Sequence, residues 1–279
     1  MNPERIVNHF TIDFELPNLP QEAPLVKRER FEERLESQLD ALLKAFDKHN
    51  VTTTFFVVGE LAARHPVLFE KIKEENHEIA SHAITHKELS EVKEEEFRKE
   101  AMKIKKLLGR VKGFRAPIFS LSQKNSFIID VLKKNRFLYD SSIVPSVTTE
   151  YGAFGAPFKP YRISSANIFK EHATSKFIEF PILTIGFGPF RIPAGGGFFL
   201  RLLPIELTEL AIKKMNHGGA PATLYAHNWE FDSKLPGVEM NFYRKTVVYY
   251  GTGGLNLKRL ERLLKGFKFG RMDESPYLK

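Results

Sequence analysis

The chain has 279 residues, 42% of them hydrophobic and 27% charged, so it can bury a substantial core and general disorder is excluded. It contains no cysteine, which excludes a disulfide framework and leaves His, Asp and Glu as the available ligands for a metal. The formal net charge is +8, which favours acidic partners. The basic residues are spread along predicted helices rather than gathered in a nucleic-acid-binding motif, so we expect no nucleic-acid partner.

Strand and helix patterns alternate along the chain. The predicted strands are Ile6–Glu15, Val51–Val58, His77–Ser81, Val111–Arg115, Phe137–Asp140, Phe177–Ile182 and Thr223–Ala226. The predicted helices are Arg28–Asn50, a segment broken by Pro66, Lys93–Leu108, Ser126–Asn135, Pro204–Asn216 and Leu255–Phe267. This alternation is typical of parallel βαβ units and predicts an α/β fold, either a barrel or an open sheet.

Three stretches lack this periodicity. Residues 16–25 form a predicted Pro-rich loop, and residues 144–175 form a long loop or insertion of the kind that is often functional. The cluster Gly195–Gly197 either brings the backbone close to a ligand or forms a tight turn. The first residues include no apolar segment, and no run approaches the ~18 apolar residues of a membrane-spanning helix, so we expect a cytoplasmic protein.

His82 and His86 lie four residues apart, directly after the predicted strand His77–Ser81. Two imidazoles at this spacing share one face of a helical turn, and neutral imidazole is a common ligand for divalent metals. The pattern therefore predicts that the two side chains bind one metal ion. The alternative is a pair of unrelated surface histidines, in a chain that has nine.

The carboxyl ends of parallel strands meet at one rim of a barrel, so polar residues at those ends become neighbours. In chain order these residues are Asp13, Glu15, His82, His86, Arg115, Asp140, Glu179 and His227. Asp13 and Glu15 are two positions apart and share one face of an extended strand. One of them can complete a site of two histidines and one carboxylate while the other acts as a general base. Alternatively, the acidic pair only caps the next turn.

Arg115 and His227 are the remaining candidates at this rim. Arg115 precedes Pro117 by two residues, and the restricted backbone there would hold the guanidinium so that it can fork onto a carboxylate. An ordinary surface cation also fits this pattern. His227 follows the last predicted strand, beside Trp229, and can protonate a leaving amine or serve as a packed polar residue.

These motifs resemble the metal-dependent polysaccharide deacetylases with the NodB-homology domain, carbohydrate esterase family four. They are most similar to the branch associated with exopolysaccharide and lipid-linked sugar assembly. The segments that carry the resemblance, in order along nearly the whole chain, are Phe10–Glu15, Ser81–Leu89, Gly113–Ser120, Tyr139–Ile143, Pro193–Phe199 and His227–Asp232. Two positions depart from the common pattern. Phe14 stands where a second aspartate is usual, with the carboxylate one residue later, and Ala83 replaces the typical Ser or Thr.

The resemblance implies a deformed (β/α)7-like barrel of parallel strands, formed by a single domain over residues 1–279, with the active site at the carboxyl-terminal rim. It implies Asp13 as the base, Arg115 as the residue that orients it and His227 as the acid. It also implies His82 and His86 as ligands of a divalent metal, with zinc expected, and we assign Glu15 as the third ligand. The residues expected to contact substrate are Pro117, Phe119, Gly196 and Trp229.

The implied reaction is hydrolysis of an N-acetyl group on an amino sugar, in a polysaccharide or in its lipid- or nucleotide-linked precursor. A lipid-linked substrate would bring the protein to a membrane surface. An inactive glycan-binding protein on the same scaffold is the alternative, and the altered acidic motif is its main support. A third hypothesis is a glycoside hydrolase that uses two of Asp13, Glu15, Glu179 and Glu230, but it leaves both histidines without a role.

Overall fold

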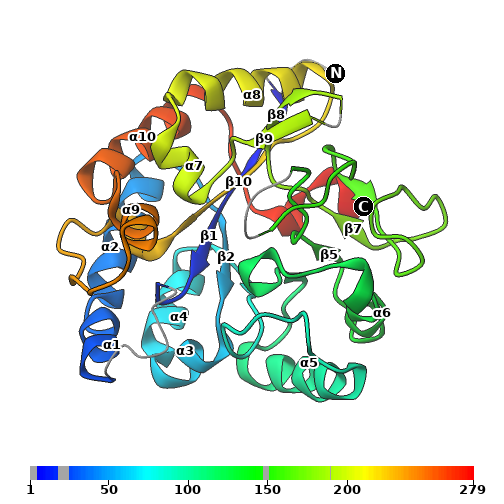
Figure 1. The fold of residues 1–279 in the computed structure, drawn as a ribbon, viewed down its shortest axis with the longest axis horizontal. Helices are drawn as coiled ribbons and strands as arrows, with labels where there is room; N and C mark the ends of the chain where they lie inside the picture. The colour runs from blue at the N-terminus through cyan, green and yellow to red at the C-terminus, as the bar shows by residue number, and fades with distance from the viewer. Residues whose placement is uncertain (1–4, 18–24, 147–150, 189) are drawn as a thin grey trace.

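The computed structural model describes residues 5–17, 25–146, 151–188 and 190–279 (Figure 1). Most of the predicted Pro-rich loop at residues 16–25 lies outside the described residues, as do residues 147–150 of the predicted loop 144–175. In the ranges given above, no helix has both the length and the apolar character needed to cross a membrane.

A sheet of eight strands forms the centre of the molecule, in the order β10-β1-β2-β3-β4-β5-β7-β6. Its strands are β1 His9–Phe14, β2 Thr54–Val57, β3 Glu78–Ser81, β4 Gly113–Phe114, β5 Tyr139–Asp140, β6 Tyr161–Arg162, β7 Ile178–Glu179 and β10 Thr223–His227. All neighbouring strands are parallel except β6, which is antiparallel to β7. Single bridges from Ile182 to Thr223 and from Gly196 to Tyr225 link the chain after β7 to β10, so the sheet curls toward closure. The parallel, barrel-like α/β fold is therefore confirmed.

Helices cover the outside of the curled sheet (Figure 1). They are α1 Leu25–Glu32, α2 Leu35–Lys48, α3 Gly59–Arg64, α4 Pro66–Glu74, α5 Glu94–Leu108, α6 Phe127–Lys134, α7 Gly197–Leu202, α8 Ile205–His217, α9 Phe242–Tyr249 and α10 Gly254–Gly266. The predicted break at Pro66 is confirmed, because this proline begins α4, where its missing N–H costs nothing.

The predicted helix Arg28–Asn50 is wrong in one respect, because it is two helices. Phe31 of α1 packs in a small cluster with Val238, whereas the apolar stripe of α2 packs against the main core. Between the helices, Arg34 donates two hydrogen bonds of 2.8 Å to the Asp232 carboxylate. The chain therefore changes direction so that each apolar face reaches a different part of the interior.

The sequence patterns missed a β-hairpin and the strand β6. β8 Thr184–Phe187 and β9 Phe190–Pro193 form a separate two-stranded antiparallel sheet at the margin of the molecule. β6 lies inside the predicted loop 144–175 and pairs only with β7. Short strands of two residues or with mixed exposure carry no clear periodic signal, which explains both omissions.

The glycine cluster brings the backbone close to a strand. A Cβ atom on Gly196 would lie 2.2 Å from the carbonyl oxygen of Tyr225, and one on Gly195 would lie 2.7 Å from the Cβ of Leu183. Gly197 then begins α7 with a φ of 53°. Glycine is required at Gly196 because the chain must pass directly over β10.

Candidate active site

The side chains of the candidate site come from the carboxyl ends of neighbouring strands. Asp13 is on β1 and Glu15 follows it, His82 directly follows β3, and His227 ends β10. The expected helical turn between His82 and His86 is wrong, because this segment is a series of bends with Ala83 at a φ of 61°. The left-handed residue folds the chain back on itself, and the two imidazole centroids still lie 5.3 Å apart.

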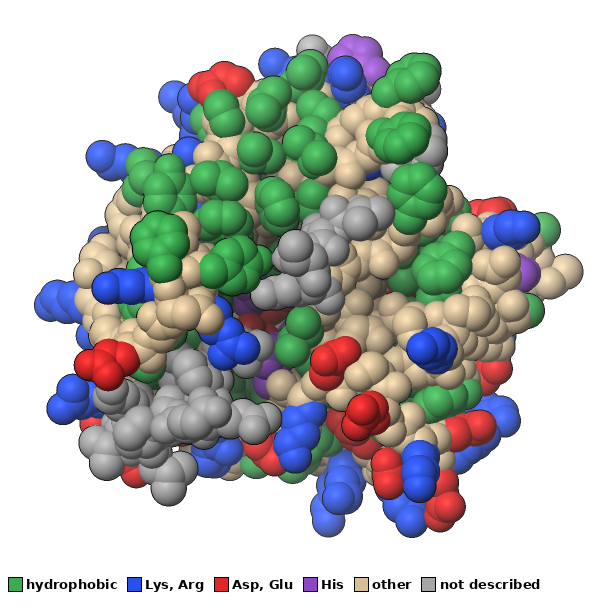
Figure 2. Space-filling view, in the orientation of Figure 1, with side chains coloured by type: hydrophobic (Ala, Val, Ile, Leu, Met, Phe, Trp, Pro, Cys, Tyr) green, Lys and Arg blue, Asp and Glu red, His purple; other side chains and the backbone are tan. Residues whose placement is uncertain are grey.

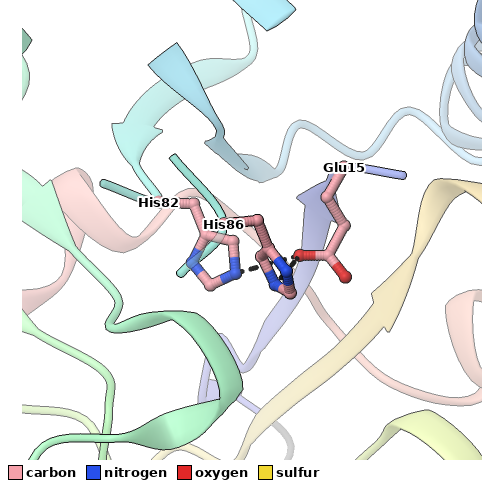
Figure 3. A group of neighbouring side chains, drawn as sticks. All are labelled: Glu15, His82 and His86. Atoms are coloured by element: carbon pink, nitrogen blue, oxygen red, sulfur yellow. Dashed lines mark ion pairs between the residues drawn. The ribbon is translucent and has the colours of Figure 1, made fainter. Parts of the chain in front are cut away.

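Glu15, His82 and His86 point toward one another (Figure 3). The Oε2 atom of Glu15 lies 3.1 Å from Nε2 of His82 and 2.7 Å from Nε2 of His86. One candidate ligand atom from each of the three residues lies within 4.8 Å of the others. The three residues that the sequence predicts as metal ligands therefore form one cluster, with two nitrogen donors and one carboxylate.

The contacts of this cluster fit a shared cation. Oε2 of Glu15 is buried and accepts no directed hydrogen bond, even though both Nε2 atoms are close to it. Nδ1 of His82 donates to the Arg115 carbonyl oxygen over 2.9 Å, which leaves the Nε2 lone pair free for a metal. Burial alone would raise the pKa of Glu15, but the charges of His86 and His227 hold it well below its usual range. An anionic carboxylate with two imidazoles suits a borderline divalent ion.

Arg115 holds Asp13 beside this cluster. The guanidinium is fully buried, and its Nη1 lies 2.5 Å from Oδ1 of Asp13. It does not form the expected two-pronged contact with a carboxylate, because its other nitrogens donate to Ser141 and Nη1 also donates to Thr11. The ring of Phe56 covers the guanidinium at 4.0 Å from its centroid. The arginine is therefore fixed on several sides and presents a single N–H to the acid.

The buried ion pair of Glu230 and Arg201 holds the ring of His227 in place. Its Nδ1 donates to Oε1 of Glu230 over 2.5 Å, and Oε2 of Glu230 accepts from Arg201 at 3.1 Å. The opposite nitrogen, Nε2, lies 3.5 Å from Oε1 of Glu15, and the ring stacks on Trp229 with centroids 4.8 Å apart. Burial alone would lower the pKa of His227, but the charge of Glu15 and the hydrogen bond to Glu230 raise it to about 9. His227 is therefore protonated at neutral pH and can donate a proton.

A pocket of about 680 Å³ opens above these residues. Figure 2 shows it as a hollow with acidic and histidine atoms at its floor. Its lining comprises Asp13, Glu15, His82, His86, Glu88, Ile118, Phe119, Tyr151, Phe198, Phe199, Arg201, Tyr225, His227, Trp229, Tyr243, Arg244, Val247 and Val248. Phe119 and Trp229, two of the residues predicted to contact substrate, line the pocket. Pro117 and Gly196 are not among the lining residues: Pro117 is buried, and Gly196 packs on Tyr225.

Asp140 and Glu179 do not face the pocket. Both are fully buried, and Glu179 accepts a hydrogen bond from the backbone N–H of Ile143 over 3.0 Å. Burial and then the neighbouring charge of Asp140 raise the pKa of Glu179 well above its usual range. Glu230 is also buried and engaged by Arg201 and His227. Of the four acids proposed for a glycoside hydrolase, only Asp13 and Glu15 line the pocket. Glu15 lies against His82 and His86, the two histidines that this hypothesis leaves without a role.

Sequence reasoning missed several residues of the site. Arg201 and Tyr243 come from α7 and α9 and lie outside the segments that carry the resemblance. Phe198 and Phe199 lie inside the segment Pro193–Phe199 but had no assigned role, and all four side chains line the pocket. Asn228 was also missed, although its Oδ1 accepts from the Glu15 backbone N–H over 2.8 Å. The sequence did carry a signal for the contact between His227 and Glu230. The two residues are three positions apart, and in a tight turn residues at this spacing lie on the same side.

Two family matches divide the chain. Residues 30–135 match the family Polysaccharide deacetylase, and residues 141–276 match a domain of unknown function, DUF3473. Strands β2 to β4 fall in the first segment and β6 to β10 in the second, while β1 precedes both and β5 lies between them. The site therefore combines His82, His86 and Arg115 from one matched segment with His227 from the other.

Two curated relatives match part of the chain. The peptidoglycan-N-acetylglucosamine deacetylase of Bacillus cereus is 37% identical over 78 residues, which is 28% of this chain and 28% of that protein. A chitooligosaccharide deacetylase of Bradyrhizobium sp. is 41% identical over 49 residues, which is 18% of this chain and 22% of that protein. The chain thus spans about a quarter of the length of the curated relatives that it matches.

Solved structures share the fold over almost the whole chain. The PuuE allantoinase superposes with a TM-score of 0.65 at 15% identity, covering 98% of this chain and 89% of that one. A CE4 family pseudoenzyme from Bacillus anthracis gives a TM-score of 0.51 at 13% identity, covering 98% and 66%. At these identities the likeness concerns the fold alone.

The fold and the site together define a protein of the polysaccharide deacetylase class. More particularly, residues 30–135 match the polysaccharide deacetylase family, and the DUF3473 segment supplies strands β6, β7 and β10 of the sheet and part of the pocket lining.

Proposed function

We propose that the protein is a metal-dependent hydrolase that removes an N-acetyl group from an amino sugar, in a polysaccharide or in its lipid- or nucleotide-linked precursor. The observation that carries this proposal is the convergence of Glu15, His82 and His86, with Asp13 and His227 on either side. We also propose zinc as the native metal, because two imidazoles and one carboxylate are a common catalytic zinc set. When bound, such a cation would polarise the acyl carbonyl and acidify water.

Asp13 acts as the proton acceptor in this proposal. Arg115 fixes one carboxylate oxygen, and the acid remains at the pocket floor within the reach of a water molecule. The oxygen of that water adds to the acyl carbon while its proton passes to Asp13. The backbone near Ile118 and Phe119, which line the pocket, is placed to contact the acyl group.

His227 acts as the proton donor. Its pKa of about 9 keeps it protonated at neutral pH, and Glu230 fixes the ring through Nδ1 so that Nε2 faces the pocket. When the carbon–nitrogen bond breaks, His227 gives its proton to the sugar nitrogen, and acetate and a free amine result. Trp229 and Phe119 supply aromatic surface for a sugar ring.

Three narrower proposals accompany this function. Residues 1–279 form one domain, supported by the single sheet that both family segments share. The protein works in the cytoplasm, and it acts in exopolysaccharide assembly, supported by the order of its sequence motifs. These proposals concern where the reaction occurs and leave the roles of the site residues unchanged.

A glycan-binding protein without turnover is the second candidate, because a pseudoenzyme shares the fold. In this protein, however, the shifted carboxylate of Glu15 reaches both imidazoles, so the departure from the common acidic motif does not disperse the cluster. An active enzyme is therefore the better supported of the two.

The test measures bound metal and acetate release on the same purified protein. We expect about one equivalent of divalent metal per chain, and acetate release from N-acetylated chito-oligosaccharides that a chelator stops and added zinc restores. Asp13→Asn should retain the metal but lose turnover by at least ~10²-fold. The matched control is Asp47→Asn, an exposed aspartate at the end of α2. Oligosaccharide binding without acetate release in the metal-loaded protein would favour the glycan-binding alternative.

A further inference from the structure

Large aromatic side chains are exposed on the face where the pocket opens. Phe187 and Phe190 at the hairpin β8–β9 are 91% and 78% exposed, and Phe242 at the start of α9 is 86% exposed. Folded proteins rarely leave several such side chains together in water. We call Phe187, Phe190, Phe198, Phe242, Tyr243 and Tyr250 the aromatic face.

The aromatic face is continuous with the mouth of the pocket. Phe198 and Tyr243 line the pocket, and Phe198 contacts Tyr250 with ring centroids 6.3 Å apart. Figure 2 shows hydrophobic side chains gathered over α7, α9 and the hairpin, around the upper side of the hollow, while charged side chains crowd the lower edge. The side of the molecule on which the pocket opens is therefore apolar above the pocket and charged below it.

The charges within the aromatic face are all of one sign. The stretches 184–203 and 240–250 contain no aspartate or glutamate, although the chain has 34 acidic residues. They contribute Arg191, Arg201, Arg244 and Lys245. Arg201 is buried and paired with Glu230, whereas Arg244 and Lys245 are exposed on α9. Glu239, just before the second stretch, is the neighbouring exposed acid along the chain. A surface that combines exposed aromatic rings with more cations than carboxylates is complementary to an anionic lipid headgroup region.

We propose that the aromatic face docks on an anionic lipid bilayer, with Phe187, Phe190 and Phe242 inserted at the headgroup boundary and the pocket mouth turned toward the membrane. Anything bound to this face covers the pocket mouth, so a protein partner would obstruct the substrate, whereas a bilayer can carry the substrate itself. If the proposed function holds, docking in this orientation also narrows the substrate to an N-acylated sugar on a lipid anchor.

The test is flotation of the full chain with vesicles. We expect binding to vesicles of equal parts phosphatidylglycerol and phosphatidylcholine, weak binding to phosphatidylcholine alone, and a decline as salt is raised. Phe187→Ser combined with Phe190→Ser should lower the partition coefficient at least ~10-fold, because both rings lose their insertion energy. Both side chains are exposed, so this variant should fold normally.

The matched control removes two exposed apolar side chains elsewhere. Val67→Ser with Met102→Ser changes positions that are 77% and 60% exposed on α4 and α5, away from the hairpin in Figure 1, and should bind vesicles like the wild type. The proposal would be overturned if the Phe187→Ser, Phe190→Ser variant bound vesicles as well as the wild type, or if the wild type did not float with vesicles. A lipid-free dimer that the hairpin variant dissociates, without vesicle binding, would assign the face to a second copy.

Acetate release from a water-soluble oligosaccharide separates this inference from the proposed function. The hairpin variant should match the wild type in that assay, because neither Phe187 nor Phe190 lines the pocket. If the wild type floats with vesicles and the hairpin variant does not, but neither protein releases acetate, the docking face stands and the proposed function fails.

Discussion

Buried carboxylates at the two ends of the central sheet have pKa values shifted in opposite directions. At the start of β3, Glu78 accepts hydrogen bonds from Thr54 at 2.7 Å and Tyr139 at 2.9 Å, and burial followed by the charge of Asp273 raises its pKa to about 7. At the opposite end of the sheet, Glu15 directly follows β1 and is also buried, yet the imidazoles around it hold its pKa well below the usual range.

Burial pushes the pKa of both acids upward, so the neighbours decide the outcome. Glu78 lies near Asp273, and its side-chain donors Thr54 and Tyr139 are neutral, so the protonated form of Glu78 is favoured. Glu15 has His86 and His227 nearby, and Glu230 likewise has Arg201. The part of the rim around His86, His227 and Arg201 therefore keeps buried negative charge on Glu15 and Glu230, which suits a cation. Glu179, at the same rim but beside Asp140, has a raised pKa, as Glu78 has at the opposite end.

The largest expected effect comes from breaking the rim cluster. His82→Ala removes one of the three candidate ligands and should reduce both metal content and acetate release, the latter by at least ~10³-fold. Circular dichroism should show a folded protein. His217→Ala, an exposed histidine at the end of α8, is the control and should change neither quantity. Near-normal turnover in His82→Ala would contradict the metal site.

A smaller loss should follow from weakening the support of His227. Glu230→Gln removes a charge that raises the pKa of His227, so that pKa should fall from about 9 and the alkaline limb of the kcat profile should move to lower pH. We expect a decrease in kcat of about 10- to 100-fold at neutral pH. Arg201→Lys keeps a cation beside Glu230 and should shift the profile less. An unshifted alkaline limb in Glu230→Gln would remove His227 from the role of acid.

The smallest effect on activity should come from the opposite end of β3. Because the folded protein binds a proton at Glu78 more tightly than the unfolded chain does, this stabilisation is complete below about pH 4.5 and is lost as pH rises to about 7. Relative to Glu78→Gln, the wild type should lose roughly 3 kcal/mol of unfolding free energy across that window. Urea unfolding at several pH values measures this difference, and a constant gap would contradict it. Acetate release should stay within about twofold of the wild type, since Glu78 lies far along the strand from the pocket.

The sequence by itself determined the strand ends and the residues they carry. A strand alternates with a fixed period and parallel strands align their carboxyl ends, so the sequence alone places Asp13, Glu15, His82 and His227 at one rim. The fold class followed from the same regular alternation of strands and helices. Local patterns are sufficient for these features because each depends on residues a few positions apart.

Tertiary structure decided the partners and the pocket. The Arg201–Glu230 pair, the single-nitrogen contact of Arg115 with Asp13 and the inward turn of Asp140 and Glu179 all depend on how distant segments pack. The bends between His82 and His86 and the hairpin β8–β9 carry no periodic signal. Ionisation and exposure are set by everything within a few ångströms of a group, and that neighbourhood exists only once the chain has folded.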